Sequence, residues 1–198
     1  PRTLSLEADA STATYFCALP ALLGGKVTIS NLGTSTTQPD FGFCDVLERM
    51  GARVTRTAST VTVEGTGKLK GGFSQDMKPN SDATPTLAAL APFADGPIHI
   101  HGVAHIRKHE SDRIAVMCKI LSDAGIAVEE HPDGMTISPG TPRHIVVDPH
   151  DDHRIAMSAS LIGLAGAGIT ITEPSCVSKT CPGYFGMLKD LALPVAEA

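Results

Sequence analysis

Acidic and basic side chains gather in four short segments of this sequence, and together they suit proton transfer on an anionic substrate. The segments are 81–82, 105–113, 150–154 and 178–180. Carboxylates accept and donate protons, whereas arginine and lysine hold carboxylate and phosphate groups. The candidate site residues are Asp82, His105, His109, Glu110, Arg113, Asp152, His153, Arg154 and Lys179.

Each segment alone has a simpler interpretation. Asp82 could be a plain helix N-cap, and residues 107–113 could be a solvated run of charges. Residues 150–153 resemble a metal-ligand cluster, but contiguous residues at a helix start rarely converge on one ion, so we predict no metal. Recurrence of such segments at equivalent positions of a repeat favours the functional interpretation.

Three strand-like segments repeat at a fixed interval, which indicates one supersecondary unit copied along the chain. Segments 27–30, 98–101 and 169–172 alternate apolar and polar residues, and each follows a glycine-bearing turn. Their starts are 71 residues apart in both steps (98 − 27 and 169 − 98). Such repeats bury their apolar faces against one another, so equivalent positions in each copy should fall at the same end of the structure.

A helix is predicted before each of these strands. The first runs from Asp9 to about Leu23 and should be kinked or shortened at Pro20. The second starts at 81–82, and the third starts near 151–152. All three are rich in alanine and apolar on almost every side, so we expect them to be buried.

An amphipathic helix is predicted after each repeated strand. Apolar residues recur at i, i+3, i+4 and i+7 from Phe43, Ile114 and Tyr184, and Gly51 and Gly125 should end the first two helices. Short strands are predicted to follow at 53–57, 61–64, 127–130 and 135–138, the last two joined by a turn at 132–134.

The bulk composition predicts one ordinary globular domain. The chain has 198 residues, a net charge of −5 and 42% hydrophobic residues. The mild acidity disfavours nucleic acid as a partner, and no apolar run reaches the roughly 18 residues that span a bilayer. Five cysteines without a CxxC motif favour the reducing cytoplasm, with the thiols serving as small buried hydrophobes.

Four motifs together resemble the EPSP synthase (3-phosphoshikimate 1-carboxyvinyltransferase) family. They are residues 9–16 (DASTATYF), 109–113 (HESDR), 152–154 (DHR) and 178–180 (SKT), and the likeness covers essentially the whole chain. The chain resembles the C-terminal half of these two-domain enzymes. Because it begins at Pro1, in a strand-like stretch, we expect a fragment or a processed chain whose partner N-terminal domain is absent.

The resemblance implies an α/β (α+β) fold of the inside-out prism type. Helices lie inside and sheets outside, in three β-α-β-α-β-β-like repeats. We expect a single domain over 1–198, with repeats at about 1–65, 66–140 and 141–198.

The resemblance also implies a reaction. Family members move the enolpyruvyl group of phosphoenolpyruvate to the 5-hydroxyl of shikimate-3-phosphate and release phosphate, in the shikimate pathway of aromatic amino acid biosynthesis. They need no metal or organic cofactor, and glyphosate competes with phosphoenolpyruvate between the domains. The catalytic residues that this likeness implies are Asp82, Glu110 and His109, with Asp82 as the proton acceptor and a shikimate ligand and Glu110 as the proton donor. Arg113, Arg154 and Lys179 are implied to hold phosphoenolpyruvate. His153 is implied to line the same pocket, and Asp152 to orient the three cations.

Two positions depart from the family pattern. Family members commonly have lysine before the Glu-Ser/Thr-Asp-Arg motif, whereas this chain has His109 there and Lys108 one place earlier. Either His109 does the work of that lysine or Lys108 reaches around. A neutral histidine would bind a phosphorylated substrate less well and make the reaction more sensitive to pH. His105 likewise stands where other members use asparagine to touch the shikimate substrate.

Two alternatives remain open on sequence alone. UDP-N-acetylglucosamine enolpyruvyl transferase shares the fold, but its members resemble one another in a Glu-Asn-Arg-Phe loop where this chain has residues 110–113. A non-catalytic binding or assembly domain of the same fold is the second. If the chain is part of an enzyme, we expect it to be nearly inactive by itself, because the substrates bind in a cleft that needs both domains.

Overall fold

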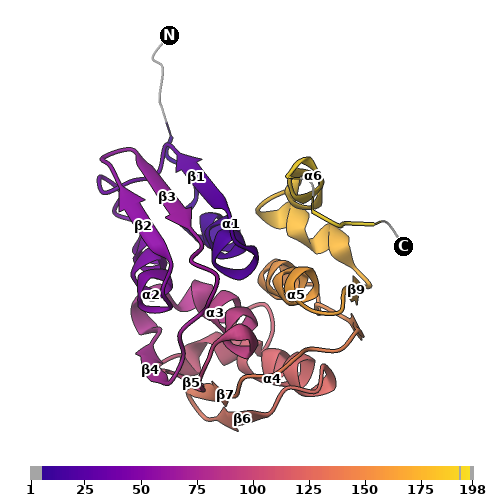
Figure 1. Ribbon diagram of the computed structural model, residues 1–198. Helices are drawn as coiled ribbons and strands as arrows, with labels where there is room; N and C mark the ends of the chain where they lie inside the picture. Colours follow the sequence, from indigo (N-terminus) through magenta and orange to yellow (C-terminus); the bar gives the residue numbers. More distant parts are fainter. Residues whose placement is uncertain (1–5, 192, 197–198) are drawn as a thin grey trace.

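In the part of the chain that the structure describes, three helices form the interior and three sheets form the outer faces (Figure 1). The computed structural model describes residues 6–191 and 193–196. The inner helices α1 (Ala10–Leu23), α3 (Thr84–Leu90) and α5 (His153–Ala165) pack against one another. Every residue of α3 is buried, because a helix that is apolar on all sides can only be stable in the interior. The fold is therefore the inside-out α/β type.

The three sheets differ in size and in strand direction. The first has the order β1-β3-β2 and is antiparallel, and the second has the order β4-β5-β7-β6, with a parallel β4–β5 pair. The third is the parallel pair β8-β9. The bounds are β1 (Lys26–Ser30), β2 (Arg53–Arg56), β3 (Thr60–Glu64), β4 (Phe73–Asp76), β5 (Ile98–His101), β6 (Val128–His131), β7 (Gly134–Ile137), β8 (Ile145–Val147) and β9 (Ile169–Ile171).

An amphipathic helix follows each repeated strand, as predicted, and the structure adds a 3-10 helix between the two. Gly51 (φ 98°) and Gly125 (φ 84°) follow the first two of these helices in the left-handed conformation, which suits glycine. The helices are α2 (Phe43–Arg49), α4 (Arg113–Asp123) and α6 (Tyr184–Asp190), and the 3-10 helices are η1 (Pro39–Gly42), η2 (Lys78–Ala83), η3 (Ala91–Phe93), η4 (Ala104–Lys108) and η5 (Pro174–Lys179).

Alternation along the strands places one face of each sheet in the core. Ile98 and Ile100 of β5 are fully buried, while His99 and His101 between and after them are partly exposed. Val61 and Val63 of β3 are fully buried in the same way. The apolar face packs on the inner helices and the polar face turns outward, because side chains alternate across a strand.

The structure differs from the sequence predictions at several points. Strands β4 and β8 were not recognised as strands, and they precede α3 and α5 as parallel partners of β5 and β9. The helix expected from 81–82 begins at Thr84, because residues 78–83 form the 3-10 helix η2. Pro20 does not end α1, which continues to Leu23. The strand-like start of the chain lies largely outside the described residues.

All five cysteines are free and buried, as the sequence predicted for small hydrophobes. Among the described residues, no helix has the length and apolar character needed to cross a bilayer.

Asp9 caps the first inner helix. Its carboxylate accepts hydrogen bonds from the backbone N–H groups of Ser11 (3.3 Å) and Thr12 (3.1 Å). We expect Asp9→Ala to lower the free energy of unfolding by about 1 kcal/mol, because two helix-end donors lose their acceptor. Urea denaturation measures this change. Glu7→Ala, which removes an exposed carboxylate outside the helix, should leave the midpoint unchanged.

Candidate active site

Asp82 lies at the centre of a network of charges at the N-terminal ends of the inner helices. Its Oδ1 accepts a hydrogen bond from Arg113 Nη1 and its Oδ2 accepts one from Arg154 Nη2, both at 2.9 Å. The Asp82 side chain remains 34% exposed, while those of Arg113 and Arg154 are 3% and 14% exposed. Asp82 is therefore not a helix cap but a carboxylate held between two largely buried guanidinium groups.

Asp152 holds the guanidinium group of Arg113 in place. Its two oxygens accept hydrogen bonds from Arg113 Nε (2.8 Å) and Nη2 (3.3 Å), and the Ser111 hydroxyl donates to one of them at 2.9 Å. Asp152 also caps α5 by accepting from the backbone N–H of Arg154 at 3.0 Å. Burial opposes ionisation of Asp152, yet the hydrogen bonds and charge of Arg113 lower the pKa of this carboxyl below its ordinary value.

Glu110 meets His153 and Lys179 beside this network. Glu110 Oε2 lies 3.1 Å from His153 Nδ1 and 3.6 Å from Lys179 Nζ. Lys179 Nζ also donates to the backbone oxygen of Asp151 at 2.5 Å and to its carboxylate at 2.9 Å. The bond to the Asp151 carboxylate raises the pKa of Lys179, so this side chain stays a cation. His150 and Asp151 both have positive φ, which is uncommon for non-glycine residues, and this turn presents the oxygens that hold Lys179.

His109 rather than Lys108 joins the network. Its Nδ1 lies 3.1 Å from Arg113 Nη1 and 3.9 Å from Asp82 Oδ1. Burial and the charge of Arg113 lower the pKa of His109, which favours the neutral ring. His105 stacks edge-on against His109 with ring centroids 5.6 Å apart. Lys108 is exposed and contacts no charged group of the described chain, so of these two residues it is His109 that lies beside Arg113 and Asp82.

Two further side chains reach the network and were not among the predicted site residues. Asp40 of η1 is buried and accepts a short hydrogen bond from the Ser11 hydroxyl. Burial raises the pKa of Asp40, and the negative charge of Asp82 adds to this effect. Tyr15 of α1 is fully buried, and burial raises its pKa to about 12 although the charge of Arg154 opposes the rise.

The signals for these two residues in the sequence were weak. Asp40 stands in Pro39-Asp40-Phe41-Gly42, a composition typical of turns. Tyr15 occupies an apolar helix where an aromatic residue is most simply a core residue. Its ring does pack edge-on against Tyr184, with centroids 6.0 Å apart.

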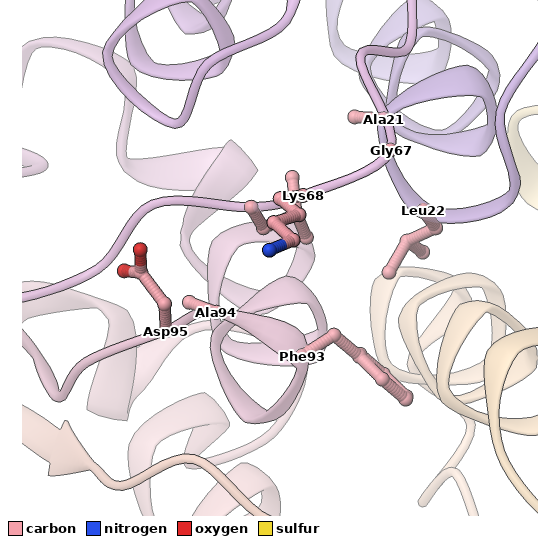
Figure 2. A pocket seen from close by; sticks show the side chains of 8 residues that line it. Ala21, Leu22, Gly67, Lys68, Phe93, Ala94 and Asp95 are labelled. Atoms are coloured by element: carbon pink, nitrogen blue, oxygen red, sulfur yellow. The ribbon is translucent and has the colours of Figure 1, made fainter.

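A cavity of about 180 Å³ lies away from the charge network (Figure 2). Its walls include Ala21 and Leu22 at the C-terminal end of α1, and Phe93 at the end of η3. The charge network lies at the opposite, N-terminal ends of the inner helices. None of the predicted site residues lines this cavity.

One group in the network has the atom types of a metal site. Ligand atoms of Glu110, Asp152 and His153 lie within 4.8 Å of one another. However, both oxygens of Asp152 already bind Arg113. A cation bound here would also be repelled by Arg113 and by Lys179 beside Glu110. The neighbouring cations therefore disfavour a metal ion at this group.

The fold defines the class of protein. It matches the enolpyruvyl transferase NikO from Streptomyces tendae with a TM-score of 0.75 at 22% identity, over 96% of this chain and 44% of that one. It matches an EPSP synthase from Acinetobacter baumannii with a TM-score of 0.83 at 29% identity, over 93% of this chain and 46% of that one. The chain has the enolpyruvyl transferase fold.

Sequence comparison defines the family within that class. The model of the EPSP synthase (3-phosphoshikimate 1-carboxyvinyltransferase) family matches residues 1–188. A 3-phosphoshikimate 1-carboxyvinyltransferase 2 from Halalkalibacterium halodurans is 53% identical over 97% of this chain, and a 3-phosphoshikimate 1-carboxyvinyltransferase from Methanosphaerula palustris is 45% identical over 94%. The chain belongs to the EPSP synthase family, and the resemblance seen in its motifs is confirmed.

The chain spans less than half the length of these curated relatives, 43% and 44% of them respectively. Both relatives carry a shikimate-specific name, so the comparisons do not favour the UDP-N-acetylglucosamine alternative. They do not favour a non-catalytic domain either.

Proposed function

We propose that this chain forms the C-terminal half of a 3-phosphoshikimate 1-carboxyvinyltransferase. The complete enzyme would transfer the enolpyruvyl group of phosphoenolpyruvate to the 5-hydroxyl of shikimate-3-phosphate and release phosphate. The observation that carries the proposal is the Asp82 carboxylate held at 2.9 Å by both Arg113 and Arg154. A base beside two cations suits deprotonation of a hydroxyl next to an anionic partner.

Three cations are proposed to hold phosphoenolpyruvate. Arg113, Arg154 and Lys179 occupy the family positions that bind its carboxylate and phosphate. In the absence of substrate, Asp82, Glu110 and Asp151 supply the anionic partners of these cations. Bound phosphoenolpyruvate would replace part of these ion pairs, because a guanidinium group can donate two parallel hydrogen bonds to a carboxylate or a phosphate.

Two proton transfers are assigned to the two exposed carboxyl groups of the network. The shikimate hydroxyl gives its proton to Asp82 as its oxygen bonds to the central carbon of phosphoenolpyruvate. The methylene carbon of phosphoenolpyruvate takes a proton from Glu110. In the second step that carbon returns a proton to the Glu110 carboxylate as the C–O bond to phosphate breaks, which forms the new enolpyruvyl double bond, and phosphate leaves with the proton that Asp82 had taken. His153 Nδ1, at 3.1 Å, orients the Glu110 carboxyl.

The other predicted residues act through position. Asp152, with no exposed surface, fixes the plane of the Arg113 guanidinium. His109 and His105 are proposed to face shikimate-3-phosphate. We propose no metal and no organic cofactor for the reaction.

We further propose a domain organisation for the chain. It is one domain of three repeats, at about 1–65, 66–140 and 141–198, which pairs with an N-terminal domain of the same enzyme. The five free thiols support a reducing compartment such as the cytoplasm.

The test is reassembly of the complete active site. The chain is co-expressed with the N-terminal half of the Halalkalibacterium halodurans relative, and phosphate release is measured with both substrates. We expect turnover from the pair, dependent on shikimate-3-phosphate, and almost none from either half alone, because positioning by both walls supplies up to about 7–11 kcal/mol. A pair that co-purifies but makes no product would contradict the proposal and favour an assembly module.

His109 should make substrate binding depend on pH. Because burial and Arg113 lower its pKa, the ring is neutral near pH 7 and becomes charged only at lower pH. In the reassembled enzyme at pH 8, we expect His109→Lys to have a lower KM for shikimate-3-phosphate than wild type. The difference between the two KM values should become smaller towards pH 5.5. Taking the ratio of the two KM values at each pH cancels the titration of the substrate phosphate. A ratio that stays constant with pH would exclude this role.

A further inference from the structure

The cavity at the C-terminal end of α1 has a charged side and an apolar side (Figure 2). The Lys68 ammonium group points towards the side on which Asp95 lies, and the side chains of Leu22 and Phe93 lie on the other. The volume of about 180 Å³ is similar to the roughly 150 Å³ of a cavity that holds one benzene ring. A ligand of matching shape would combine one small apolar group with a charged head.

Neither of the two charges at this cavity is neutralised by the protein. Lys68 forms no ion pair or side-chain hydrogen bond with any residue that the structure describes. One oxygen of Asp95 accepts a hydrogen bond from the backbone N–H of Gly71 at 2.6 Å, and the other oxygen has no partner among the described residues. A ligand that carries both a carboxylate and an ammonium group would pair with both side chains, because each of its charges meets the opposite charge.

Backbone contacts hold the Lys68 and Asp95 segments side by side. Leu69 and Ala94 form a parallel β-bridge, and the Asp95 N–H donates to the Leu69 carbonyl oxygen at 2.9 Å. Gly67 has a φ of 90°, so a residue in the left-handed conformation turns the chain immediately before Lys68. The backbone on the charged side of the cavity is therefore ordered before a ligand binds, which lowers the cost of binding.

Two helix ends supply the apolar side of the cavity. Leu22 comes from the last turn of α1 and Phe93 from the end of η3, and both are half-buried. The adjoining Ala21 and Ala94 are buried, and their short side chains leave room between the larger ones. A hydrocarbon group bound here would be favoured, because apolar surface of both the ligand and the protein is removed from water.

We propose that this cavity binds an α-amino acid with an apolar side chain. The carboxylate of the amino acid pairs with Lys68, its ammonium group pairs with the free oxygen of Asp95, and its side chain packs against Leu22 and Phe93. A simple carboxylate would meet the negative charge of Asp95, and a simple amine would meet the positive charge of Lys68. The cavity is therefore selective for a zwitterion.

Titration of L-phenylalanine into the isotope-labelled chain, followed by two-dimensional NMR of the backbone amides, tests the proposal. We expect saturable shifts of the amide signals of Lys68 and Asp95, with a dissociation constant on the order of 1 mM, as a small open site allows. Phenylpropionate lacks the ammonium group and phenethylamine lacks the carboxylate, so each should bind at least about tenfold more weakly. Glycine lacks the apolar side chain and should not saturate the shifts at the same concentrations.

Three variants locate the two charges that bind the ligand. Lys68→Met should weaken binding of L-phenylalanine at least about tenfold, and so should Asp95→Asn, which keeps an acceptor for the Gly71 N–H. Lys70→Met is the matched control and should bind as wild type, because it removes an exposed lysine that does not line the cavity. The dispersion of the spectra shows that each protein is folded. A chain that is not folded alone is measured in the pair with the N-terminal half.

Two results would overturn the proposal. One is the absence of saturable shifts around the cavity in wild type, or equal binding by wild type, Lys68→Met and Asp95→Asn. The other is a set of shifts at Glu110 and Arg113 instead, which would place the carboxylate of the amino acid among the cations of the charge network. Because that network lies at the opposite ends of the inner helices and the readout is binding without substrates, either result leaves the proposed transferase function untouched.

Discussion

Arg113→Met is expected to lower the free energy of unfolding by about 3–5 kcal/mol, the largest effect of any single replacement in the charge network. Arg113 has 3% of its side chain exposed, and Asp152 has none. Removing the guanidinium leaves a buried carboxylate whose charge has no partner. Urea denaturation of wild type and variant at pH 7 measures the loss.

The same variant should show a characteristic dependence on pH. Arg113 lowers the pKa of Asp152 in the folded protein, so this pair stabilises wild type above the ordinary carboxyl pKa, and the contribution is lost as pH falls through the lowered value. In Arg113→Met, burial is opposed only by the hydrogen bonds from Ser111 and from the Arg154 backbone, so the pKa of Asp152 should rise and protonation should relieve the destabilisation. The difference between the two proteins should shrink from pH 7 towards about pH 4.

An exposed ion pair on the same helix supplies the control. Lys119 Nζ lies 2.7 Å from Asp123 Oδ2, with side chains 72% and 49% exposed. Lys119→Met should change the free energy of unfolding by no more than about 0.5 kcal/mol, because water and salt screen such pairs. Equal losses for Arg113→Met and Lys119→Met would show that burial of the Arg113–Asp152 pair does not matter.

Asp82→Asn is expected to reduce kcat/KM of the reassembled enzyme by about 10²–10⁴. The amide keeps the size of the side chain but cannot take the proton of the attacking hydroxyl. Asp82 also pairs with the largely buried Arg113 and Arg154, so urea denaturation of the variant accompanies the kinetics and separates lost turnover from lost folding. Steady-state phosphate release, with substrate saturation checked, separates kcat from KM.

Asp123→Asn is the matched variant for this experiment, because it makes the same chemical change at an exposed position of α4. It should retain wild-type turnover. If Asp82→Asn also retains it, the assignment of Asp82 as the proton acceptor is wrong, and Asp40 becomes the next carboxyl to test.

Sequence periodicity was sufficient for the elements whose pattern is local. The alternation at 98–101 and the i, i+3, i+4 spacing from Ile114 predicted β5 and α4, because burial of one face dictates such patterns. Strands β4 (FSQD) and β8 (IVV) were missed, because neither sequence alternates apolar and polar residues, although they are as short as the predicted strands β5 and β9. Their parallel pairing with β5 and β9 depends on tertiary contacts that no short window of sequence contains.

In the candidate site, too, some residues could be predicted from the sequence and others depend on tertiary packing. Asp82, Glu110, Arg113 and Arg154 could be predicted, because charged residues at repeated offsets are conspicuous in a chain with 19% charged residues. Asp40 could not, since its carboxyl reaches the network only after η1 and η2 pack together. The register of β5, β7 and β6 likewise decides that His99 and His131 both reach the Thr136 hydroxyl.

A crystal structure of the reassembled enzyme with shikimate-3-phosphate and glyphosate tests the central claim most directly. That claim is that Asp82, Glu110 and the three cations surround one anionic guest. The account predicts nitrogen atoms of Arg113, Arg154 and Lys179 within about 3 Å of glyphosate oxygens, with the shikimate hydroxyl against Asp82. Both ligands bound elsewhere, with the pairs of Asp82 to Arg113 and Arg154 intact, would contradict it.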